Sequence, residues 1–332
     1  MTKPMVLLLG DISQAKESWT SLCSIAEIIT PTATNRASFM SEARNGAFDG
    51  CIAVYRTLPS ISLTGRFDAD LLLSLPSSLR FIAHCAAGYD QIDVSACAAR
   101  GIAVSHTPGA VDDSTADTAA FLILGALRNL SPSLLSLRRG EWRGRPPCGL
   151  GHDPRGKVLG VLGMGGVGRN LKAKMDAFGM RAIYHNRNKL SEEDAAGAEY
   201  VSFEELLARS DVLSLNLPLS EKTRHIISSQ EFGMMKDGVV VVNTARGPVM
   251  DEDALVKALD LGKVAGAGLD VYEHEPEVHP GLVDNPNVLL LPHMGTWSCE
   301  TIAKMEELCI ANVRSAIEQG KLSTPVPEHK NL

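Results

Sequence analysis

The stretch that decides the fold of this chain is VLGVLGMGGVGRNLKAKM, from Val158 to Met175. It joins a short apolar run to an amphipathic segment through Gly163, Gly165 and Gly168, which have the spacing G-x-G-x-x-G. The first glycine permits a tight turn, the second lets a pyrophosphate approach the backbone, and the third lets a helix pack closely on a strand. A glycine-rich turn without a ligand is the alternative, but the strand before, the helix after and a second strand beyond favour a dinucleotide site.

Short apolar runs alternate with amphipathic segments on both sides of this stretch. Such alternation is typical of parallel sheets covered by helices. We therefore predict an α/β protein with two doubly wound, Rossmann-like domains. The runs predicted as strands are Met5–Leu9, Gly50–Val54, Phe81–His84, Ala103–His106, Val158–Leu162, Arg181–Tyr184, Val212–Leu215, Gly238–Asn243, Gly266–Asp270 and Val288–Leu291.

The last part of the chain suggests how the two domains are connected. Residues Cys299–Gly320 have a helical pattern and are too few to form a domain. The simplest arrangement returns this helix to the first domain, so that the nucleotide-binding domain is inserted into a discontinuous one. We expect residues 1–110 and 299–332 to form the substrate-binding (catalytic) domain and residues 111–298 to form the dinucleotide-binding domain.

Composition and charge exclude several classes of protein. The chain has 332 residues, 45% of them hydrophobic, which is enough for two ordinary cores. Its net charge of −7, without clusters of Lys and Arg, argues against a nucleic-acid partner. The seven cysteines form no C-x-x-C pair, which fits reduced thiols in the cytoplasm. No stretch approaches the ~20 apolar residues of a membrane span, so we expect a soluble cytoplasmic protein with no membrane partner.

A long helix is predicted from Asp112 to Leu130, with the sequence DDSTADTAAFLILGALRNL. Its part from Asp117 to Leu130 is apolar nearly all round, and a helix of that kind must be buried. Either the other domain or a second subunit would cover it, and we expect a homodimer. The segment 138–156 is rich in Gly, Pro and Arg, shows no periodicity, and predicts a long connection or an arm.

Ionisable residues follow three successive strands of the second domain. Arg246 stands in NTARG, two acidic residues (Glu273 and Glu275) follow in GLDVYEHEP, and His293 stands in LPHMG. Ligands bind at the carboxyl ends of the strands in open α/β sheets. A histidine that donates a proton, a carboxylate that keeps it protonated and an arginine that binds a carboxylate suit the reduction of a 2-oxo acid. Each residue alone is more often structural, but together they form a catalytic hypothesis.

A metal site is the competing interpretation of one short segment. His274, Glu275, Glu277 and His279 have the residue types of metal ligands. Two prolines among them break any helix that could align the four side chains. We therefore expect no metal here.

The end of the second strand of the dinucleotide unit bears on the choice of cofactor. The sequence there is IYHNRNKL, from Ile183 to Leu190. An NAD site usually places an Asp or Glu at this point to bind the ribose hydroxyls. Asn186, Arg187 and Asn188 instead present hydrogen-bond donors and one positive charge, which would favour a 2′-phosphate. An exposed arginine without a ligand is the alternative. We predict a preference for NADP (NADPH), with NAD as the second cofactor.

With these residues assembled, the chain resembles the D-isomer-specific 2-hydroxyacid dehydrogenase family, and within it the glyoxylate/hydroxypyruvate reductases. GMGGVG, NTARG, GLDVYEHEP and LPHMG occur in the order of that family, and the resemblance extends over most of the chain. It implies that Arg246 orients the substrate, that Glu275 is the partner of the histidine, and that His293 is the acid/base. The implied reaction is the NAD(P)H-dependent reduction of a small 2-oxo acid to a D-2-hydroxy acid.

The resemblance also implies a substrate site in the first domain. The backbone amides of Ala87 and Gly88, in AAGYDQID, resemble the carboxylate cradle of the family. Members of the family often have a bulkier residue at this point, which leaves the pocket size open. Glyoxylate, hydroxypyruvate and larger aryl or sugar 2-oxo acids share the recognised groups, so the larger acids are an alternative. We expect Arg56, Trp297 and Trp142 of a partner subunit to form the pocket wall.

Together with the glycine fingerprint, the resemblance implies a larger set of cofactor-binding residues and a dimer formed through the long helix and the arm after it. The amides of the fourth and fifth residues of GMGGVG would point at the phosphates from the start of a helix. The full set is Thr115, Gly163, Gly165, Gly166, Val167, Gly168, Asn186, Arg187, Asn188, Leu217, Pro218, Thr223, Thr244, Ala245, Arg246, Asp270, His293 and Gly295.

A function of another class stays open, because a fold alone does not establish an activity. Some relatives of this fold are nucleotide-sensing corepressors that bind peptide motifs. Those proteins carry long additional tails, whereas this chain ends with TPVPEHKNL shortly after the last predicted helix. We therefore expect an enzyme and keep a corepressor-like binding protein as the alternative.

Overall fold

The computed structural model describes residues 3–144 and 147–332. Arg145 and Pro146, in the middle of the predicted connection, lie outside the described residues. The chain divides into two compact units, of which the first comprises Met1–Val111 and Trp297–Leu332 and the second comprises Asp112–Thr296. Each unit contains one parallel sheet. The predicted α/β class with two Rossmann-like sheets is confirmed.

The first unit is built on a five-stranded sheet in the order β2-β1-β3-β4-β5. Four of these strands were predicted, and β2 was not, because its three residues, EII, are too few to show a period. The strands are β1 (Met5–Leu9), β2 (Glu27–Ile29), β3 (Cys51–Thr57), β4 (Phe81–Cys85) and β5 (Ala103–Ser105).

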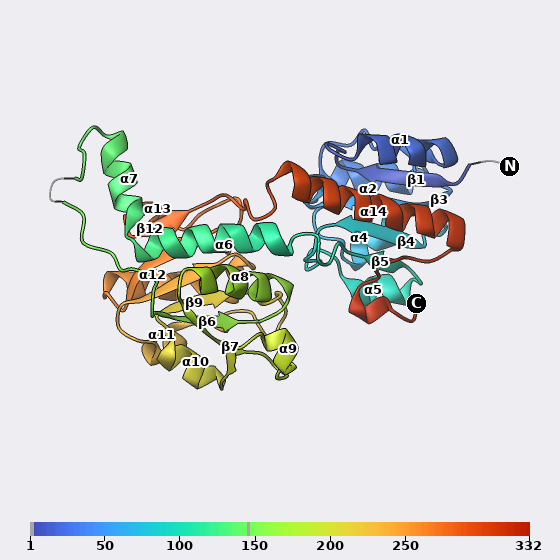
Figure 1. The fold of residues 1–332 in the computed structure, drawn as a ribbon. Coiled ribbons are helices and arrows are strands. Elements are labelled where there is room, and N and C mark those ends of the chain that lie inside the picture. The colour runs from blue at the N-terminus through green and yellow to red at the C-terminus, as the bar shows by residue number, and fades with distance from the viewer. Residues whose placement is uncertain (1–2, 145–146) are drawn as a thin grey trace. The chain divides into compact units, whose positions relative to one another are not determined.

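Helices cover both faces of this sheet. The longest, α14, crosses one face and packs on β3 and β4 (Figure 1). The predicted helix at 299–320 agrees with α14 to within one residue. The helices of the first unit are α1 (Lys16–Ile25), α2 (Arg36–Arg44), α3 (Ile61–Thr64), α4 (Ala69–Ser74), α5 (Val94–Ala99) and α14 (Cys299–Gln319), with 3-10 turns at Leu58–Ser60 and Pro327–His329.

A buried carboxylate joins α14 to the start of α1. Glu306 accepts hydrogen bonds from the backbone N–H groups of Ser13, Gln14 and Ala15, each 2.8 Å long. Burial alone would raise the pKa of Glu306, but these hydrogen bonds lower it below its usual value. Since Ala15 has no capping side chain of its own, Glu306 satisfies the free amides at the start of α1.

The second unit is built on a seven-stranded sheet in the order β12-β11-β10-β9-β6-β7-β8. Six of the strands were predicted, and the two-residue strand β8 was not. The strands are β6 (Val158–Leu162), β7 (Arg181–His185), β8 (Glu199–Tyr200), β9 (Val212–Leu215), β10 (Val239–Asn243), β11 (Val264–Leu269) and β12 (Val288–Leu290).

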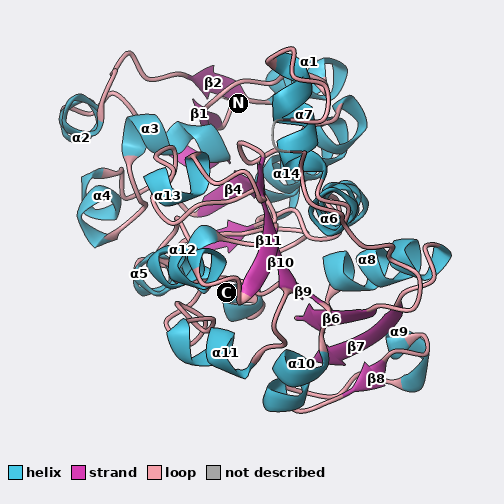
Figure 2. Cartoon of the chain, turned by 90° about the vertical axis from the view of Figure 1, so that its left-hand side faces the viewer, coloured by secondary structure: helices cyan, strands magenta, loops and turns pink. Residues whose placement is uncertain are grey.

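Two layers of helices enclose this second sheet. Figure 2 shows α6 and α8 on one face and α10, α11 and α12 on the other, and each layer has its own apolar core. The helices are α6 (Asp112–Leu127), α7 (Leu130–Arg138), α8 (Gly166–Ala177), α9 (Glu192–Ala195), α10 (Phe203–Arg209), α11 (Ser229–Met234), α12 (Glu252–Asp260) and α13 (Pro280–Val283), with a 3-10 turn at Gly247–Val249.

The predicted long helix is two helices. α6 ends at Leu127, and Asn129, in the left-handed region at φ 51°, precedes α7, which turns by 82° (Figure 1). Asparagine adopts this backbone more readily than most residues. Most apolar side chains of α6 are buried against α8, β10 and β11 of its own unit. Phe121 is the exception, with 53% of its surface exposed.

Whether a helix can cross a membrane depends on its length and its hydropathy. Among the described residues, no single helix is long and apolar enough to cross a membrane. α6 and α7 would reach that length and composition only as a pair, across their bend of 82°.

Candidate active site

The glycine fingerprint lies between β6 and α8. The local geometry shows why each of its three positions is a glycine. Gly163 has φ +94°, and a Cβ there would stand 2.7 Å from the carbonyl oxygen of Asn216. A Cβ on Gly168 would stand 2.9 Å from the side chain of Val161, so this glycine lets α8 pack against β6. Around Gly165 the described residues leave the space open to at least 4 Å. The backbone there is accessible to a pyrophosphate.

Two buried polar atoms beside the fingerprint lack partners among the described residues. They are Oδ1 of Asn216, just after β9, and Oγ1 of Thr244, just after β10. Buried polar atoms are normally hydrogen-bonded, so unpaired ones indicate a missing partner. Because β9 and β10 are neighbours, both atoms lie at the carboxyl edge of the sheet where a dinucleotide binds. These residues fit a nicotinamide dinucleotide.

The loop after β7 is held by the fingerprint itself. The N–H of Met164 donates to Oδ1 of Asn186 over 2.7 Å, so the amide oxygen of Asn186 is already used. Its NH₂ group can donate to a ligand. Arg187 and Asn188 are exposed, and within residues 3–144 and 147–332 neither forms a hydrogen bond or an ion pair. The loop therefore presents donors and a positive charge to solvent.

Other predicted cofactor residues have structural partners. The hydroxyl of Thr223 donates to the carbonyl of Pro218 over 2.6 Å and closes its own loop. Leu217 packs on the core beside Gly163. Thr115, at the start of α6, donates to the carbonyl of Gly295 over 3.3 Å. These contacts place the residues near the carboxyl edge of the sheet without showing what they bind.

Arg246 is positioned by a residue that the sequence analysis missed. Asn243, at the end of β10, is fully buried, and its Nδ2 donates to the carbonyl of Arg246 over 2.9 Å. Its Oδ1 accepts from the N–H of Ala245 over 3.0 Å. The loop that carries Arg246 is thus held at two successive residues. A polar residue ending the apolar run VVVVN was the signal for this role.

Glu275 and His293, which are 18 residues apart, meet in the structure. Nδ1 of His293 donates to Oε2 of Glu275 over 2.8 Å, and Oε1 of Glu275 accepts from the N–H of Tyr272 over 3.0 Å. No described residue bonds Nε2 of His293, which is left for a ligand. Burial alone would raise the pKa of Glu275, but its hydrogen bonds and the charge of Arg246 lower it below its usual value. Glu275 is therefore ionised at neutral pH.

Asp270 holds the backbone that carries this histidine. It is almost fully buried, and its two oxygens accept from the N–H groups of Met294 (2.6 Å) and Gly295 (2.8 Å). Its carbonyl accepts from the N–H of His293 over 2.8 Å. His293 has φ 56°, in the left-handed region, which costs about 1 kcal/mol or more. Three hydrogen bonds to one aspartate maintain this conformation. Burial raises the pKa of Asp270.

The two residues of the predicted carboxylate cradle lie in the first unit, in the loop after β4. Among the described residues, none accepts a hydrogen bond from the N–H of Ala87 or Gly88. Arg56, which we expected in the pocket wall, has a fully buried side chain in the first unit. Trp142 and Trp297 are both 72% exposed.

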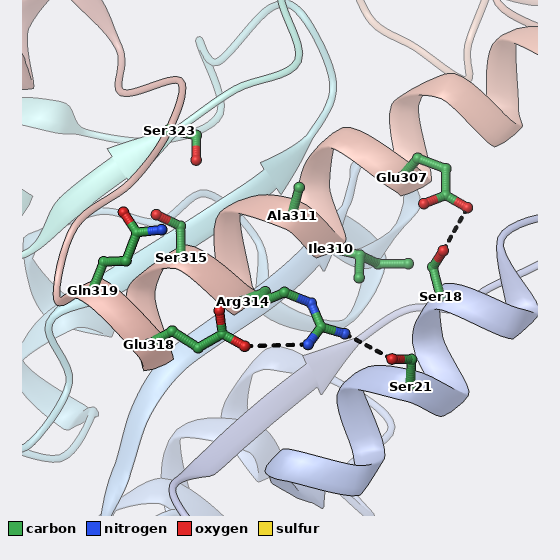
Figure 3. Close-up of a pocket in the computed structure, with 10 residues that line it drawn as sticks. All are labelled: Ser18, Ser21, Glu307, Ile310, Ala311, Arg314, Ser315, Glu318, Gln319 and Ser323. Carbon is green, nitrogen blue, oxygen red and sulfur yellow. Dashed lines mark hydrogen bonds and ion pairs between the residues drawn. The ribbon is translucent and has the colours of Figure 1, made fainter.

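A surface groove lies between α1 and α14 (Figure 3). Five of its polar side chains pair with one another. Arg314 bonds Ser21 over 3.0 Å and Glu318 over 3.3 Å, and Ser18 bonds Glu307 over 2.7 Å. The groove contains none of the predicted site residues.

The segment considered as a metal site has other contacts. His279 pairs with Asp253 over 3.0 Å, and its Nδ1 accepts from the N–H of Gly281. In the described part of the chain, no three His, Cys, Asp or Glu side chains are placed to hold a metal ion.

The sequence of this chain is similar to those of known proteins. Residues 120–295 match the family model described as D-isomer specific 2-hydroxyacid dehydrogenase, NAD binding domain. The 4-methyl-2-oxopentanoate reductase A of Aspergillus oryzae is 54% identical over 329 residues, which are 99% of this chain and 99% of that protein.

Solved structures extend the similarity to the fold. A glyoxylate reductase from Paecilomyes thermophila superposes with a TM-score of 0.96 and 53% identity, covering 99% of this chain and 100% of that one. An NADPH-dependent glyoxylate/hydroxypyruvate reductase from Sinorhizobium meliloti, in complex with NADP and malonate, gives a TM-score of 0.85 at 30% identity, with 99% and 98% of the two chains covered.

Proposed function

The chain belongs to the D-isomer-specific 2-hydroxyacid dehydrogenase family of NAD(P)-binding oxidoreductases, and we propose that it reduces glyoxylate, hydroxypyruvate or a similarly small 2-oxo acid to a D-2-hydroxy acid, with NADPH preferred. The observation that carries the proposal is the pairing of His293 with an ionised Glu275, which leaves Nε2 free. A bound NADPH supplies the hydride that reduces the carbonyl carbon.

The residues of this chain supply the proton and the orientation. Nε2–H of His293 donates a proton to the carbonyl oxygen as it becomes an alkoxide, so that the hydride forms the new C–H bond and the proton completes the hydroxyl group. The Glu275 carboxylate stabilises the imidazolium before the transfer and orients the ring through Nδ1. Arg246, on a loop held by buried Asn243, binds the substrate carboxylate and polarises the carbonyl.

The substrate carboxylate would also bind the free N–H groups of Ala87 and Gly88. Two observations support a small 2-oxo acid, namely the similarity to a glyoxylate reductase and the similarity to a glyoxylate/hydroxypyruvate reductase. A second candidate is the reduction of larger 2-oxo acids, of the branched, aryl or sugar kind. The 54% identity to a 4-methyl-2-oxopentanoate reductase favours it, as does the small side chain of Ala87.

The loop after β7 supports the preference for NADPH. An aspartate in place of Asn186 could accept from Met164 with one oxygen and from a ribose hydroxyl with the other. Asn186 has a single oxygen, which already accepts from Met164, and its NH₂ group adds two donors. With the exposed charge of Arg187 beside it, the loop suits a phosphate better than a hydroxyl.

A kinetic panel tests the reaction and its substrate. Purified protein would be assayed with NADPH and with NADH against glyoxylate, hydroxypyruvate and 4-methyl-2-oxopentanoate. We expect steady NADPH oxidation and the highest kcat/KM for one of the two small acids. A higher kcat/KM for 4-methyl-2-oxopentanoate would establish the second candidate. Absence of turnover with every acid would contradict the enzyme and favour a corepressor-like binding protein.

Arg187→Ala tests the cofactor preference, with Arg181→Ala as its matched control. Arg181 carries the same charge and is exposed, but it stands at the opposite end of β7. Loss of a charge-assisted contact should raise the KM for NADPH about tenfold in Arg187→Ala and leave the KM for NADH nearly unchanged. The control should change neither value. Equal losses for both cofactors would mean that Arg187 holds the loop.

We also propose a homodimer that buries the apolar face of α6 and α7. Phe121 on α6 and four leucines of α7 are between 41% and 53% exposed, more apolar surface than a monomer usually presents. Light scattering at micromolar concentration should report a dimer. A monomer would contradict the proposal. The four leucines are Leu130, Leu134, Leu135 and Leu137.

A further inference from the structure

A fully buried arginine lies beside the loop that contains Ala87 and Gly88. Arg56 is at the end of β3, and its Nη2 donates to Oε1 of Gln91 over 2.8 Å. Its Nη1 lies 3.3 Å from Nδ1 of His84, which is also fully buried, and its guanidinium lies 5.0 Å from the ring centre of Phe67. Burying a charge is costly unless its hydrogen bonds are satisfied. The burial of Arg56 therefore indicates that its charge and its hydrogen bonds have a function.

The contacts of Arg56 determine the protonation of His84. A guanidinium can only donate, so Nδ1 of His84 must accept. Nε2 of His84 lies 3.0 Å from the carbonyl oxygen of Gly88, which can only accept, so Nε2 carries the proton. His84 is thus a neutral ring with one tautomer, and the hydrogen bonds run from Arg56 through His84 to Gly88.

Three successive carbonyl groups of the loop are held in this way. The carbonyl of Ala86 accepts from the N–H of Thr107 over 2.9 Å. The carbonyl of Ala87 accepts from Nδ1 of His106 over 2.8 Å, and that of Gly88 accepts from His84. The carbonyl oxygens of residues 86–88 therefore all face donors within the protein.

The peptide geometry then places the N–H groups. In a trans peptide the N–H of the next residue points opposite to the carbonyl. Each held carbonyl therefore turns one N–H away from the group that holds it, namely the N–H of Ala87, of Gly88 and of Tyr89. None of the three donates to a residue in the described part of the chain. Their hydrogen bonds are therefore left for a ligand or for solvent.

Arg56 also holds the other end of this loop, at Gln91. Gln91, which accepts from Nη2, is bonded through its carbonyl to the N–H of Phe67 over 2.9 Å. Burial lowers the pKa of Arg56 to about 10, with the charge of Asp90 acting in the opposite direction. Arg56 is therefore charged at neutral pH. A fixed cation beside the loop favours an anion near its free N–H groups.

We propose that Arg56 and His84 are positioning residues for the carboxylate of the 2-oxo acid. Arg56 fixes the tautomer of His84, and His84 fixes the Gly88–Tyr89 peptide. The N–H of Tyr89 thereby becomes a third donor of the carboxylate cradle, beside those of Ala87 and Gly88. This inference rests on the proposed function, since it deepens the substrate site of that reaction.

Steady-state kinetics with His84→Leu and His84→Gln give the first test. Leucine removes the donor to Gly88, whereas glutamine keeps an N–H that can reach the same carbonyl. We expect His84→Leu to raise the KM for the 2-oxo acid about tenfold or more, with kcat and the KM for NADPH changed much less. His84→Gln should recover most of the loss. An unchanged KM in a folded His84→Leu protein would overturn the proposal.

His329→Leu is the matched control. His329 is also buried in the first unit and also bonds two backbone groups, the N–H of Val104 (3.0 Å) and the carbonyl of Val94 (2.8 Å). It should lower the melting temperature without raising the KM. If His84→Leu does not fold, Arg56→Lys provides the test, because an ammonium keeps the charge but cannot bond His84 and Gln91 together. Its KM should rise too, and an unchanged KM would again overturn the proposal.

A binding measurement separates this inference from the proposed function. The amide ¹H–¹⁵N signals of Ala87, Gly88 and Tyr89 would be followed while oxamate, an analogue of a 2-oxo acid, is added in the presence of NADP. We expect all three signals to shift and saturate in the parent and to respond weakly in His84→Leu. Saturating shifts in a protein that turns over no 2-oxo acid would support the cradle and contradict the function. Turnover without a shift of Tyr89 would contradict the third donor alone.

Discussion

His293 in the second unit and His84 in the first are both tied at Nδ1 to a charged side chain, with opposite consequences. The partner of His293 is a carboxylate, which accepts, so Nδ1 donates and Nε2 stays open. The partner of His84 is a guanidinium, which donates, so Nδ1 accepts and Nε2–H is committed to a carbonyl. A carboxylate partner favours the protonated, positively charged imidazole ring, whereas a guanidinium partner favours the neutral ring.

The two histidine rings also differ in their exposure to solvent. The side chain of His293 is 29% exposed, whereas His84 is fully buried. A ring that transfers a proton must reach its substrate, and a ring that holds a peptide has to be kept from water. The same residue type can thus serve chemistry or positioning, and the donor or acceptor nature of the partner distinguishes the two.

The largest expected effect concerns the proton donor. His293→Asn should lower kcat by about 10²–10⁴-fold and leave cofactor binding intact, because general-acid catalysis is lost. Asparagine is chosen since it tolerates the left-handed backbone of this position. The measurement is kcat together with cofactor affinity by fluorescence titration. His279→Asn, which removes another carboxylate-paired histidine of the same unit, should keep kcat close to that of the parent. Near-normal turnover in His293→Asn would contradict the role of His293 as the proton donor, and with it the contrast with His84.

The second effect concerns the carboxylate partner. The pKa of Glu275 is lowered, so the parent retains this charge throughout the neutral range. In Glu275→Gln the negative charge that stabilises a positively charged His293 ring is gone. We expect the falling limb of the pH–rate profile of reduction to move to lower pH, with kcat at neutral pH about tenfold lower. Overlapping profiles of parent and variant would show that the pair is structural only.

A smaller effect is expected for the residue that positions His293. Asp270→Asn leaves one acceptor oxygen where two amides now donate, so the loop at Met294 and Gly295 should loosen. We expect kcat to fall several-fold, by roughly 1 kcal/mol of lost stabilisation, with little change in the KM for the 2-oxo acid. Asp251→Asn makes the same substitution at the start of α12 in the same unit, where asparagine still caps the helix, and should leave kcat unchanged. A rise in KM without a fall in kcat would place Asp270 at the substrate instead.

The smallest kinetic effect is expected for Glu306 of the first unit. Because its pKa is lower in the folded state, its contribution to stability is present above the unfolded value of about 4.3 and is lost as pH falls through the folded value. Glu306→Gln should lower the free energy of unfolding by about 1–2 kcal/mol near neutral pH. The difference should shrink on acidification, and the KM for the 2-oxo acid should not change.

Urea unfolding at about pH 7 and about pH 3.5 measures this dependence. The matched control is Glu307→Gln, which changes an exposed neighbour that accepts a hydrogen bond from Ser18. A constant difference across pH would show that shape, and not charge, is what Glu306 contributes. A raised KM would show that the positioning network of the first unit extends beyond Arg56 and His84.

The sequence by itself determined the class of fold and most of its strands. Apolar runs bounded by turn residues predicted ten strands, because burial in a parallel sheet leaves a local pattern. The two missed strands, β2 and β8, have three and two residues, too few for a pattern. The break between α6 and α7 was missed as well, since it depends on one left-handed residue, Asn129, within a continuous apolar run.

At the site, the sequence placed Arg246, Glu275 and His293 together because parallel strands end at a common edge, and their catalytic roles stay a prediction. The tertiary structure decided which atoms donate and which accept. Arg56 and His84 are 28 residues apart, and nothing local to either shows that one fixes the tautomer of the other. Hydrogen-bond direction depends on the partner that stands opposite, and only folding brings that partner into place.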